Sequence, residues 1–353
     1  MGSITTRMGD GYTVTLTADE VRRDLSEGSE DAARRGKIPA LDEREIDYLF
    51  DLFASPRRIV GVQRGHEAIL SKDGCGNTLY SAQLSSGVGL PLSREQAIRT
   101  FERAFGFDTF ELGHTDYTFK QVKPIVALEQ TTMETVLLTT IVPLFYGAMP
   151  NLGLYAQPDG PFPNPSELLP EGKVDEARQA QEVAAEACRR DIVWMGEKMA
   201  ETGADGFNLD TTAAAGDAEF LAALQATEEL AAKTDLAVEM GMAAEVVLGF
   251  HGQLEYKGVR LAGLWPHQQV KLAEQAGVSI FGPVVNTNTR KSTPWNVARA
   301  STFVKACSEA ASIPIHANVG MGVGGVPMFE VPPPDAVTQA SVALIEIGKA
   351  DGL

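Results

Sequence analysis

Polar side chains recur where the short apolar segments of this sequence end. Three pairs stand two positions apart, His114 with Asp116, Asn286 with Asn288, and His316 with Asn318. In an extended chain such residues face the same side, so both members of a pair can point toward one site. Carboxylates neutralise positive charge and amide oxygens accept N–H groups, so a ring of these side chains would suit an ammonium ion. The complete set is Glu111, His114, Asp116, Asp210, Glu239, Asn286, Asn288, His316 and Asn318.

Each member of this set also has an ordinary structural interpretation. Glu111 could point outward, and a histidine on a strand is often a hydrogen-bonded core residue. The gathering of several polar residues at one predicted end of a sheet therefore carries more weight than any single member.

A glycine-rich run, GMGVGG at 320–325, matches the G-x-G-x-x-G pattern. A dinucleotide site would need a helix to begin there, so that a phosphate meets the amino end of that helix. The segment that follows, residues 326–334, contains four prolines and cannot continue as a helix. We therefore expect Gly320, Gly322 and Gly325 to allow close backbone approach to a ligand or a partner.

Other reactive groups are not evident in the sequence. The His and Cys residues lack the close spacing of a zinc site, and Asp210-Thr211-Thr212 is no dedicated magnesium signature. There is no G-x-S-x-G elbow, and no cysteine ends a predicted strand. We expect a cation site without a metal ion and without a cofactor bound by this chain.

The elements that must position these residues begin near residue 105, where apolar segments alternate with amphipathic helices. Repeated βα units imply a parallel sheet covered by helices, either open and doubly wound or closed as a (β/α)8 TIM barrel. We favour the α/β barrel, because the strand count approaches eight and polar residues gather at the strand carboxyl ends. Strands are predicted at residues 109–113, 142–147, 207–210, 236–240, 278–285 and 313–319. Helices are predicted at 174–201, 218–233, 266–275, 294–311 and 334–349.

Residues 1–104 are predicted to form a mostly helical α/β extension, and residues 105–353 the barrel domain. Thr17 and Glu20 have the spacing of a capping box that opens a helix through Leu25. A second helix is expected at 41–53, short strands at 59–62 and 68–70, and a loop rich in Gly, Ser and Asn at 73–89.

One predicted connection, residues 143–170, is unusual because it contains seven prolines. Proline restricts the chain and removes a donor, so we expect an ordered, irregular segment rather than a helix. It could form a lid or partner surface, or it could be a packed structural insertion.

The formal charge of −17, from 30 basic and 47 acidic residues, disfavours nucleic acid and anionic membrane surfaces as partners. The three cysteines are far apart, which fits a reducing compartment, and no apolar run is long enough for a membrane span. We expect a cytoplasmic protein that assembles with copies of itself.

The last residues, Ala350-Asp351-Gly352-Leu353, read as the opening of a strand. The triplet Ala-Asp-Gly also stands at 204–206, directly before the predicted strand at 207–210. A strand with one apolar residue buries little, so we expect the barrel to be incomplete at its carboxyl end.

Several long strings resemble the dimethylamine–corrinoid protein methyltransferases. The resemblance runs from RMGDG at 7–11 to Leu353. The strings are ELGHTDY at 111–117, PLFYGAMPN at 143–151, NLDTTAAAGD at 208–217, LWPHQQ at 264–269, FGP at 281–283, NTNT at 286–289 and GMGVGG at 320–325.

This resemblance implies a (β/α)8 barrel that moves one methyl group from dimethylamine to the cobalt of a corrinoid protein, the reaction that feeds methanogenesis. The corrinoid would be carried by that partner. The resemblance also implies a pyrrolysine, encoded by an amber codon, directly after Leu353, whose imine carbon would bind the amine. A chain that ends at Leu353 would then be truncated and inactive.

Strand position, rather than any family motif, assigns individual roles. Asp210 and Glu239 are the predicted catalytic carboxylates. The predicted partner rim combines the proline-rich connection with Gly320, Gly322 and Gly325. The predicted substrate-binding residues are Glu111, His114, Asp116, Asn286, Asn288 and His316. Two alternatives stay open, a non-catalytic protein that binds methylated ammonium or the corrinoid protein, and a metal-dependent barrel lyase.

Overall fold

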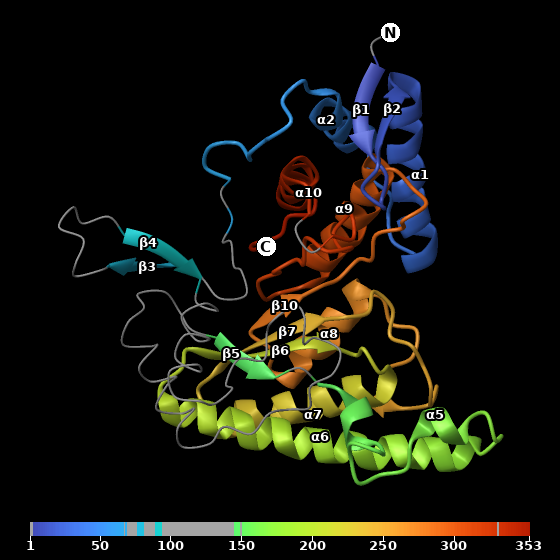
Figure 1. Ribbon diagram of the computed structural model, residues 1–353, viewed down its shortest axis with the longest axis vertical. Helices are drawn as coiled ribbons and strands as arrows, with labels where there is room; N and C mark the ends of the chain where they lie inside the picture. The colour runs from blue at the N-terminus through green and yellow to red at the C-terminus, as the bar shows by residue number, and fades with distance from the viewer. Residues whose placement is uncertain are drawn as a thin grey trace.

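A parallel β-sheet forms the centre of the computed structural model, which describes residues 3–66, 68, 76–80, 89–93, 145–148, 150–329 and 332–353 (Figure 1). Its strands are β5 (Phe145–Ala148), β6 (Gly206–Thr212), β7 (Ala237–Met242) and β10 (Ile280–Gly282), in the spatial order β10-β7-β6-β5. The predicted strands at 142–147, 207–210, 236–240 and 278–285 are thereby confirmed, with shifted ends. The strand expected at 109–113 lies outside the described residues.

Two further parallel bridges extend the sheet beyond β10. Phe281 pairs with Ile315, and His316 pairs with Gly352. The N–H groups of Asp351 and Gly352 donate to the Ile315 carbonyl at 2.9 and 3.1 Å. Strand-like pairing at 350–353 is therefore confirmed, and the strand expected at 313–319 is reduced to its central residues. From β5 to Gly352, the segments of this sheet that follow one another in the sequence are also adjacent in the sheet.

The helices after residue 170 form where the periodicity predicts them. They are α6 (Val174–Thr202), α7 (Asp217–Lys233), α8 (Pro266–Ala276), α9 (Thr293–Ala310) and α10 (Pro334–Glu346). Sequence signals explain their ends: α6 stops at left-handed Gly203, and Ser292 caps α9 by accepting the Trp295 N–H. None of the helices among the described residues is long and apolar enough to cross a bilayer.

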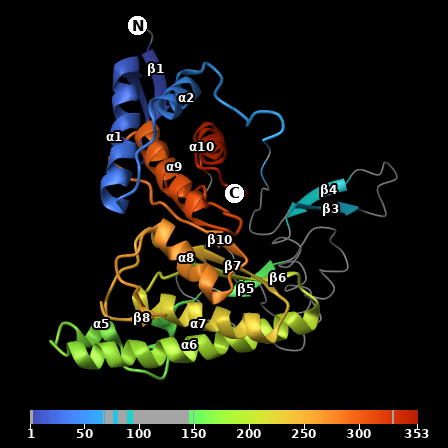
Figure 2. The same ribbon diagram turned by 180° about the vertical axis from the view of Figure 1, so that it is seen from behind.

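One face of the sheet is apolar and packs against the helices. Phe207, Leu209, Val238, Met240 and Phe281 are completely buried there. In both views of the ribbon, α6 and α7 run along one side of the sheet, and these strand residues share one hydrophobic cluster with residues of both helices (Figures 1 and 2). Burial of this face fixes the register, because a shift by one residue would turn the apolar side chains away from the helices.

The amino-terminal elements are a hairpin and two helices. They are β1 (Ser3–Arg7), β2 (Thr13–Thr17), α1 (Ala18–Gly36) and α2 (Glu43–Ala54). The capping box between Thr17 and Glu20 is confirmed, but α1 continues to Gly36 rather than ending at Leu25. The hairpin was not predicted, although the Thr-Val-Thr-Leu-Thr sequence of β2 alternates polar and apolar residues.

Two predictions for the segment after α2 are wrong. Residues 59–62 form no strand, because this segment runs along α10, where the Val60 N–H points to the Thr338 hydroxyl at 3.4 Å. The expected loop at 73–89 instead contributes β3 (Gly76–Tyr80), which pairs with β4 (Gly89–Ser93). The strand expected at 68–70 lies almost wholly outside the described residues.

The amino-terminal elements share a hydrophobic cluster with the helices of the second predicted domain. Val21, Leu25 and Leu49 pack with Val297 of α9 and Ala343 of α10. Gly28 allows α1 to approach α9 closely, since a Cβ atom there would lie 2.1 Å from the Trp295 carbonyl oxygen. The predicted boundary at residue 104 is untested, but among the described residues the cluster of the amino-terminal elements includes residues of α9 and α10.

The proline-rich connection forms short turns that pack against α6. It contains η1 (Leu152–Tyr155) and α5 (Pro165–Leu168), and Leu152, Tyr155 and Ala156 are buried. The Tyr155 hydroxyl donates to Asp191 of α6 at 2.7 Å. Residues 150–170 therefore have the contacts of a packed insertion. A small hairpin, β8 (Glu255–Tyr256) and β9 (Val259–Arg260), completes the described strands.

Candidate active site

The second face of the sheet is polar. Register places Asn208 of β6 beside Glu239 of β7, while Leu209 and Met240 are the next pair and point to the helices. Because successive strand residues alternate between faces, Asp210 shares the face of Asn208. His316 follows Ile315, which pairs with buried Phe281, so it also lies on the polar face. Side chains from β6, from β7 and from the segment beyond β10 therefore lie on one surface.

Glu239 and His316 are in direct contact on this face. The His316 Nδ1 atom lies against the Glu239 Oε1 atom, and the two side chains are 21% and 14% exposed. The His316 backbone N–H donates to the Phe281 carbonyl at 2.9 Å, which fixes the position of its strand. The pair combines a proton donor or acceptor with a carboxylate at a partly open position, which is the arrangement that acid–base chemistry requires.

Asp210 is held at an irregularity of β6. The pairing with β7 shifts between Leu209 and Thr212, and Thr211 has φ of 53°, which is unfavourable for a β-branched residue. The Thr211 N–H donates to Asp210 Oδ1 at 2.8 Å. On β7, a Cβ at Gly241 would lie 3.0 Å from the same oxygen, so glycine leaves room for the carboxylate.

The loop that follows Asp210 is anchored by a buried carboxylate, Glu219 of α7. Its two oxygens face the N–H groups of Ala215 at 3.3 Å and Leu152 at 3.4 Å, so one side chain joins the loops after β6 and β5. Complete burial raises the pKa of Glu219 to about 8, although the backbone donors favour its ionised form. Glu219 is therefore a support of the site loop rather than a member of the polar face.

The predicted asparagines after β10 lie in an exposed loop. The backbone N–H of Asn286 donates to Glu245 at 3.0 Å, and Asn286 bridges to Val323. The side-chain oxygen of Asn288 accepts the Arg290 N–H at 3.0 Å, which is a local turn contact. The loop lies beyond the strand end, and these contacts do not join the two amides to the Glu239–His316 pair.

The glycine-rich run folds back on its own chain. Gly320 and Val323 form a tight bridge, and Gly322 and Gly325 have φ of 83° and 90°. A Cβ at Gly325 would lie 2.8 Å from the Val297 Cα atom of α9. Internal packing thus accounts for Gly325. The predicted role of these glycines in a partner rim is untested.

Three predicted site residues, Glu111, His114 and Asp116, lie outside the described residues. Among the residues that the structure does describe, no three His, Cys, Asp or Glu side chains are grouped as ligands for a metal ion.

The structure adds one residue to the predicted site, Asn208. Its Oδ1 atom is buried and has no hydrogen-bond partner within the described part of the chain. The sequence carried a signal for it, because Asn208 stands two residues before Asp210 and so shares its face. A search limited to strand ends misses Asn208, because this residue lies inside β6.

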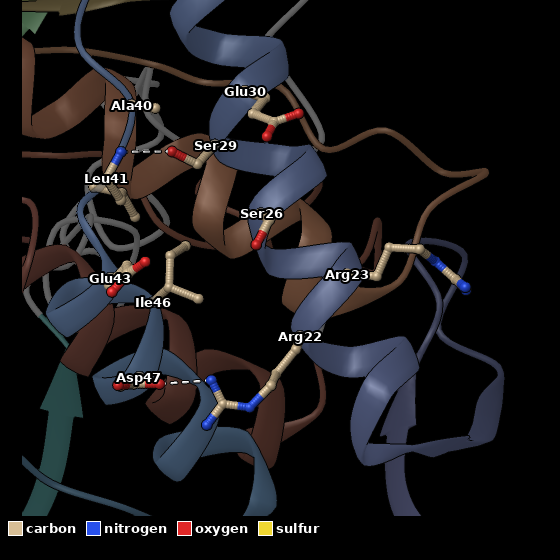
Figure 3. A pocket seen from close by; sticks show the side chains of 10 residues that line it. All are labelled: Arg22, Arg23, Ser26, Ser29, Glu30, Ala40, Leu41, Glu43, Ile46 and Asp47. Carbon is tan, nitrogen blue, oxygen red and sulfur yellow. Dashed lines mark hydrogen bonds and ion pairs between the residues drawn. The ribbon is translucent and has the colours of Figure 1, made fainter.

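A separate groove of about 490 Å³ lies between α1 and α2 (Figure 3). Arg22 crosses it to Asp47 at 2.5 Å, and its guanidinium also lies 4.1 Å from the centre of the Phe50 ring. The groove also contains Ser26 and Glu30, and its one charge pair is satisfied internally. Nothing in this arrangement adds to the polar face of the sheet.

The sequence model of the dimethylamine methyltransferase family matches residues 3–353. No solved structure gives a significant match to the chain.

Proposed function

This chain belongs to the dimethylamine methyltransferase family, and from that premise we propose that it transfers one methyl group from dimethylamine to cobalt(I) of a corrinoid carried by a partner protein. The other product is monomethylamine. The observation that carries the proposal is the contact between Glu239 and His316 on the face that also bears Asp210. The family match supplies the substrate class, and this face supplies groups that suit an ammonium ion.

We also propose that the sheet closes into a (β/α)8 barrel. From β5 to Gly352, spatial order follows chain order without reversal. An open doubly wound sheet reverses its order at a switch point, whereas a barrel does not. In a barrel the polar face would be the interior, with the strand carboxyl ends at its mouth.

Charge balance favours the protonated amine as the bound species. When a methyl group leaves dimethylammonium without the N–C electron pair, that pair stays on nitrogen and the leaving group is neutral monomethylamine. Cobalt(I) in the partner's corrinoid supplies the electron pair for the new bond to carbon. Asp210 and Glu239 balance the charge of the ammonium before transfer.

The roles of the residues follow from their contacts. His316 contacts Glu239 Oε1, which fixes the carboxylate and leaves Oε2 to accept an N–H from the substrate. The pair can also hold a proton close to the amine nitrogen. Positioning of this kind contributes a large part of the rate when two reactants must be aligned.

The pyrrolysine implied by the resemblance stays a prediction, as does the inactivity of a chain without it. Gly352 pairs with His316, so in a strand that continues, the residue after Leu353 would face the same side as His316. Such a residue would supply an electrophilic imine next to Asp210, Glu239 and His316, and dimethylammonium would first have to pass a proton to one of these groups, because only the neutral amine has a lone pair that can add to the imine carbon.

We place partner docking on the loops at the strand carboxyl ends. Tyr12, Met328 and Phe329 are 77%, 64% and 43% exposed. Gly11 of the hairpin turn lies against the Phe329 ring, since a Cβ there would overlap it. Exposed apolar side chains from two distant segments are typical of a protein interaction surface.

Absorbance of the corrinoid tests the proposal. Protein made from its full reading frame is mixed with dimethylamine and a reduced corrinoid protein from the same source, and cobalt methylation is followed with time. We expect Glu239→Gln to lower the rate roughly 100-fold, as loss of a general acid–base group does. Glu228→Gln is the matched control, because Glu228 accepts a hydrogen bond from Tyr256 and forms an ion pair with Lys257, away from the sheet. An unaffected Glu239→Gln variant, or a wild-type protein that methylates no cobalt, would contradict it.

A further inference from the structure

Asn208 is a buried acceptor without a donor on the proposed substrate face. Within the described residues nothing donates to its Oδ1 atom, yet the side chain as a whole is partly exposed. A buried carbonyl oxygen without a hydrogen bond costs free energy, so such an atom calls for an explanation. A bound ligand with an N–H group would supply the missing donor.

The neighbour of Asn208 across the sheet is Glu239. Asn208 and Glu239 are direct partners in the parallel register of β6 and β7, so their side chains stand side by side on one face. Gly147 of β5 is the partner of Asn208 on the other side, and the two backbones lie so close that a Cβ atom at Gly147 would be 1.7 Å from the Asn208 carbonyl oxygen. The face therefore presents a neutral acceptor and a charged acceptor next to each other.

We propose that Asn208 Oδ1 and the Glu239 carboxylate each accept one N–H of the substrate ammonium, and that this pair selects secondary over tertiary amines. The inference rests on the proposed function. Dimethylammonium has two N–H groups and satisfies both acceptors. Trimethylammonium has one, which goes to the charged acceptor, and it leaves Asn208 Oδ1 unpaired. Tetramethylammonium has none.

Equilibrium binding of three salts, dimethylammonium, trimethylammonium and tetramethylammonium chloride, tests this without turnover. NMR titration of the full-length protein gives each dissociation constant. We expect Asn208→Leu to raise the dissociation constant of dimethylammonium about tenfold or more, because a hydrogen bond from a charged donor is lost. The dissociation constant of trimethylammonium should change little. The preference between the two amines should then largely disappear. Asn208→Asp keeps an acceptor and should retain dimethylammonium binding.

The control variant is Gln181→Leu, since Gln181 of α6 has another buried side-chain oxygen without a donor in the described structure. It should leave the preference unchanged. Equal weakening of both amines by Asn208→Leu would show that Asn208 only supports the fold and would overturn the inference, as would unchanged binding. A wild-type protein that binds none of the amines would overturn the proposed function as well.

Discussion

Glu219 is the side chain whose environment departs most from that of an ordinary glutamate. It is completely buried at the start of α7, and burial raises its pKa to about 8. Burial raises the pKa of the nearby Cys188 thiol, and the charges of Glu219 and Asp191 raise it further. Glu219 also binds the loop between Asp210 and α7. Its protonation state is therefore linked to the stability of the loop that carries a candidate catalytic residue.

The first residue-scale prediction concerns pH. Glu219 loses its proton near pH 4.5 in the unfolded chain but near pH 8 in the folded protein. The protonated side chain therefore stabilises the folded state fully below about pH 4.5, and this stabilisation is lost as the pH rises to about 8. Glu219→Gln removes this titration. We expect the free energy of unfolding of the variant, relative to wild type, to rise by a few kcal/mol between pH 5 and 8.

Urea denaturation at several pH values measures this difference. Glu176→Gln, at an exposed position in the first turn of α6, controls for the loss of a surface carboxylate and should show no such trend. A wild-type-minus-variant difference that is flat between pH 5 and 8 would show that Glu219 is ionised throughout.

Residue positions that depend only on strand boundaries were predictable. Glu239 and His316 stand on the same face of one parallel sheet, on strands that β10 separates, and both were predicted from strand position without any side-chain detail. Asn288 could not be assigned from strand position, because an asparagine side chain can equally well accept the N–H two residues further on and form a local turn, as it does here with Arg290. Asn208 was missed because a residue inside a strand gives no end signal.

At the scale of elements, α1, α9 and the loop after β7 are joined by one buried cation. Arg299 is 7% exposed and donates to Asp31 of α1 at 3.0 Å and to Glu245 at 2.5 and 2.8 Å. Glu245 in turn accepts the Asn286 N–H, so the network reaches the loop beside the site. Two carboxylates and one guanidinium satisfy one another where water has little access.

Removal of Arg299 should therefore destabilise the protein strongly. Arg299→Met leaves Asp31 and Glu245 partly buried without their shared cation, which we expect to cost about 3–5 kcal/mol of unfolding free energy. Arg34→Met is a matched control, because Arg34 also binds Asp31 but is 76% exposed and should cost less than about 1 kcal/mol. Chemical denaturation of both variants measures the difference. Equal costs would mean that burial of the network contributes nothing.

Elements with strong local signals were predicted almost residue by residue. The helices α6, α8 and α9 have a capping residue or a left-handed glycine at one end, so local sequence determines those ends. The segment at 59–62 has apolar residues but lies along α10, and a tertiary contact decided its conformation. Sheet order was beyond the sequence, since pairing depends on contacts between distant segments.

At the scale of the molecule, we expect the amino-terminal elements and the sheet to unfold together. The cluster of Val21, Leu25 and Leu49 is completed by residues of α9 and α10, and α9 also supplies Phe303 to the cluster beneath the sheet. In Figure 1 the amino-terminal helices gather around α9 and α10 beyond the β10 edge. Because α9 contributes to both clusters of the described residues, we infer one cooperative unit.

Hydrogen exchange with and without Leu25→Ala tests this inference. Leu25 is completely buried in α1, so truncation should cost about 2–5 kcal/mol. In one cooperative unit, protected amides of α1 and of β6, far from the mutation, should lose protection equally, because both exchange through the same global opening. Leu248→Ala, at a position that is 64% exposed, should change neither. Loss of protection confined to α1 and α2 would show that the amino-terminal elements unfold independently, and the boundary predicted at residue 104 would then mark a separate folding unit.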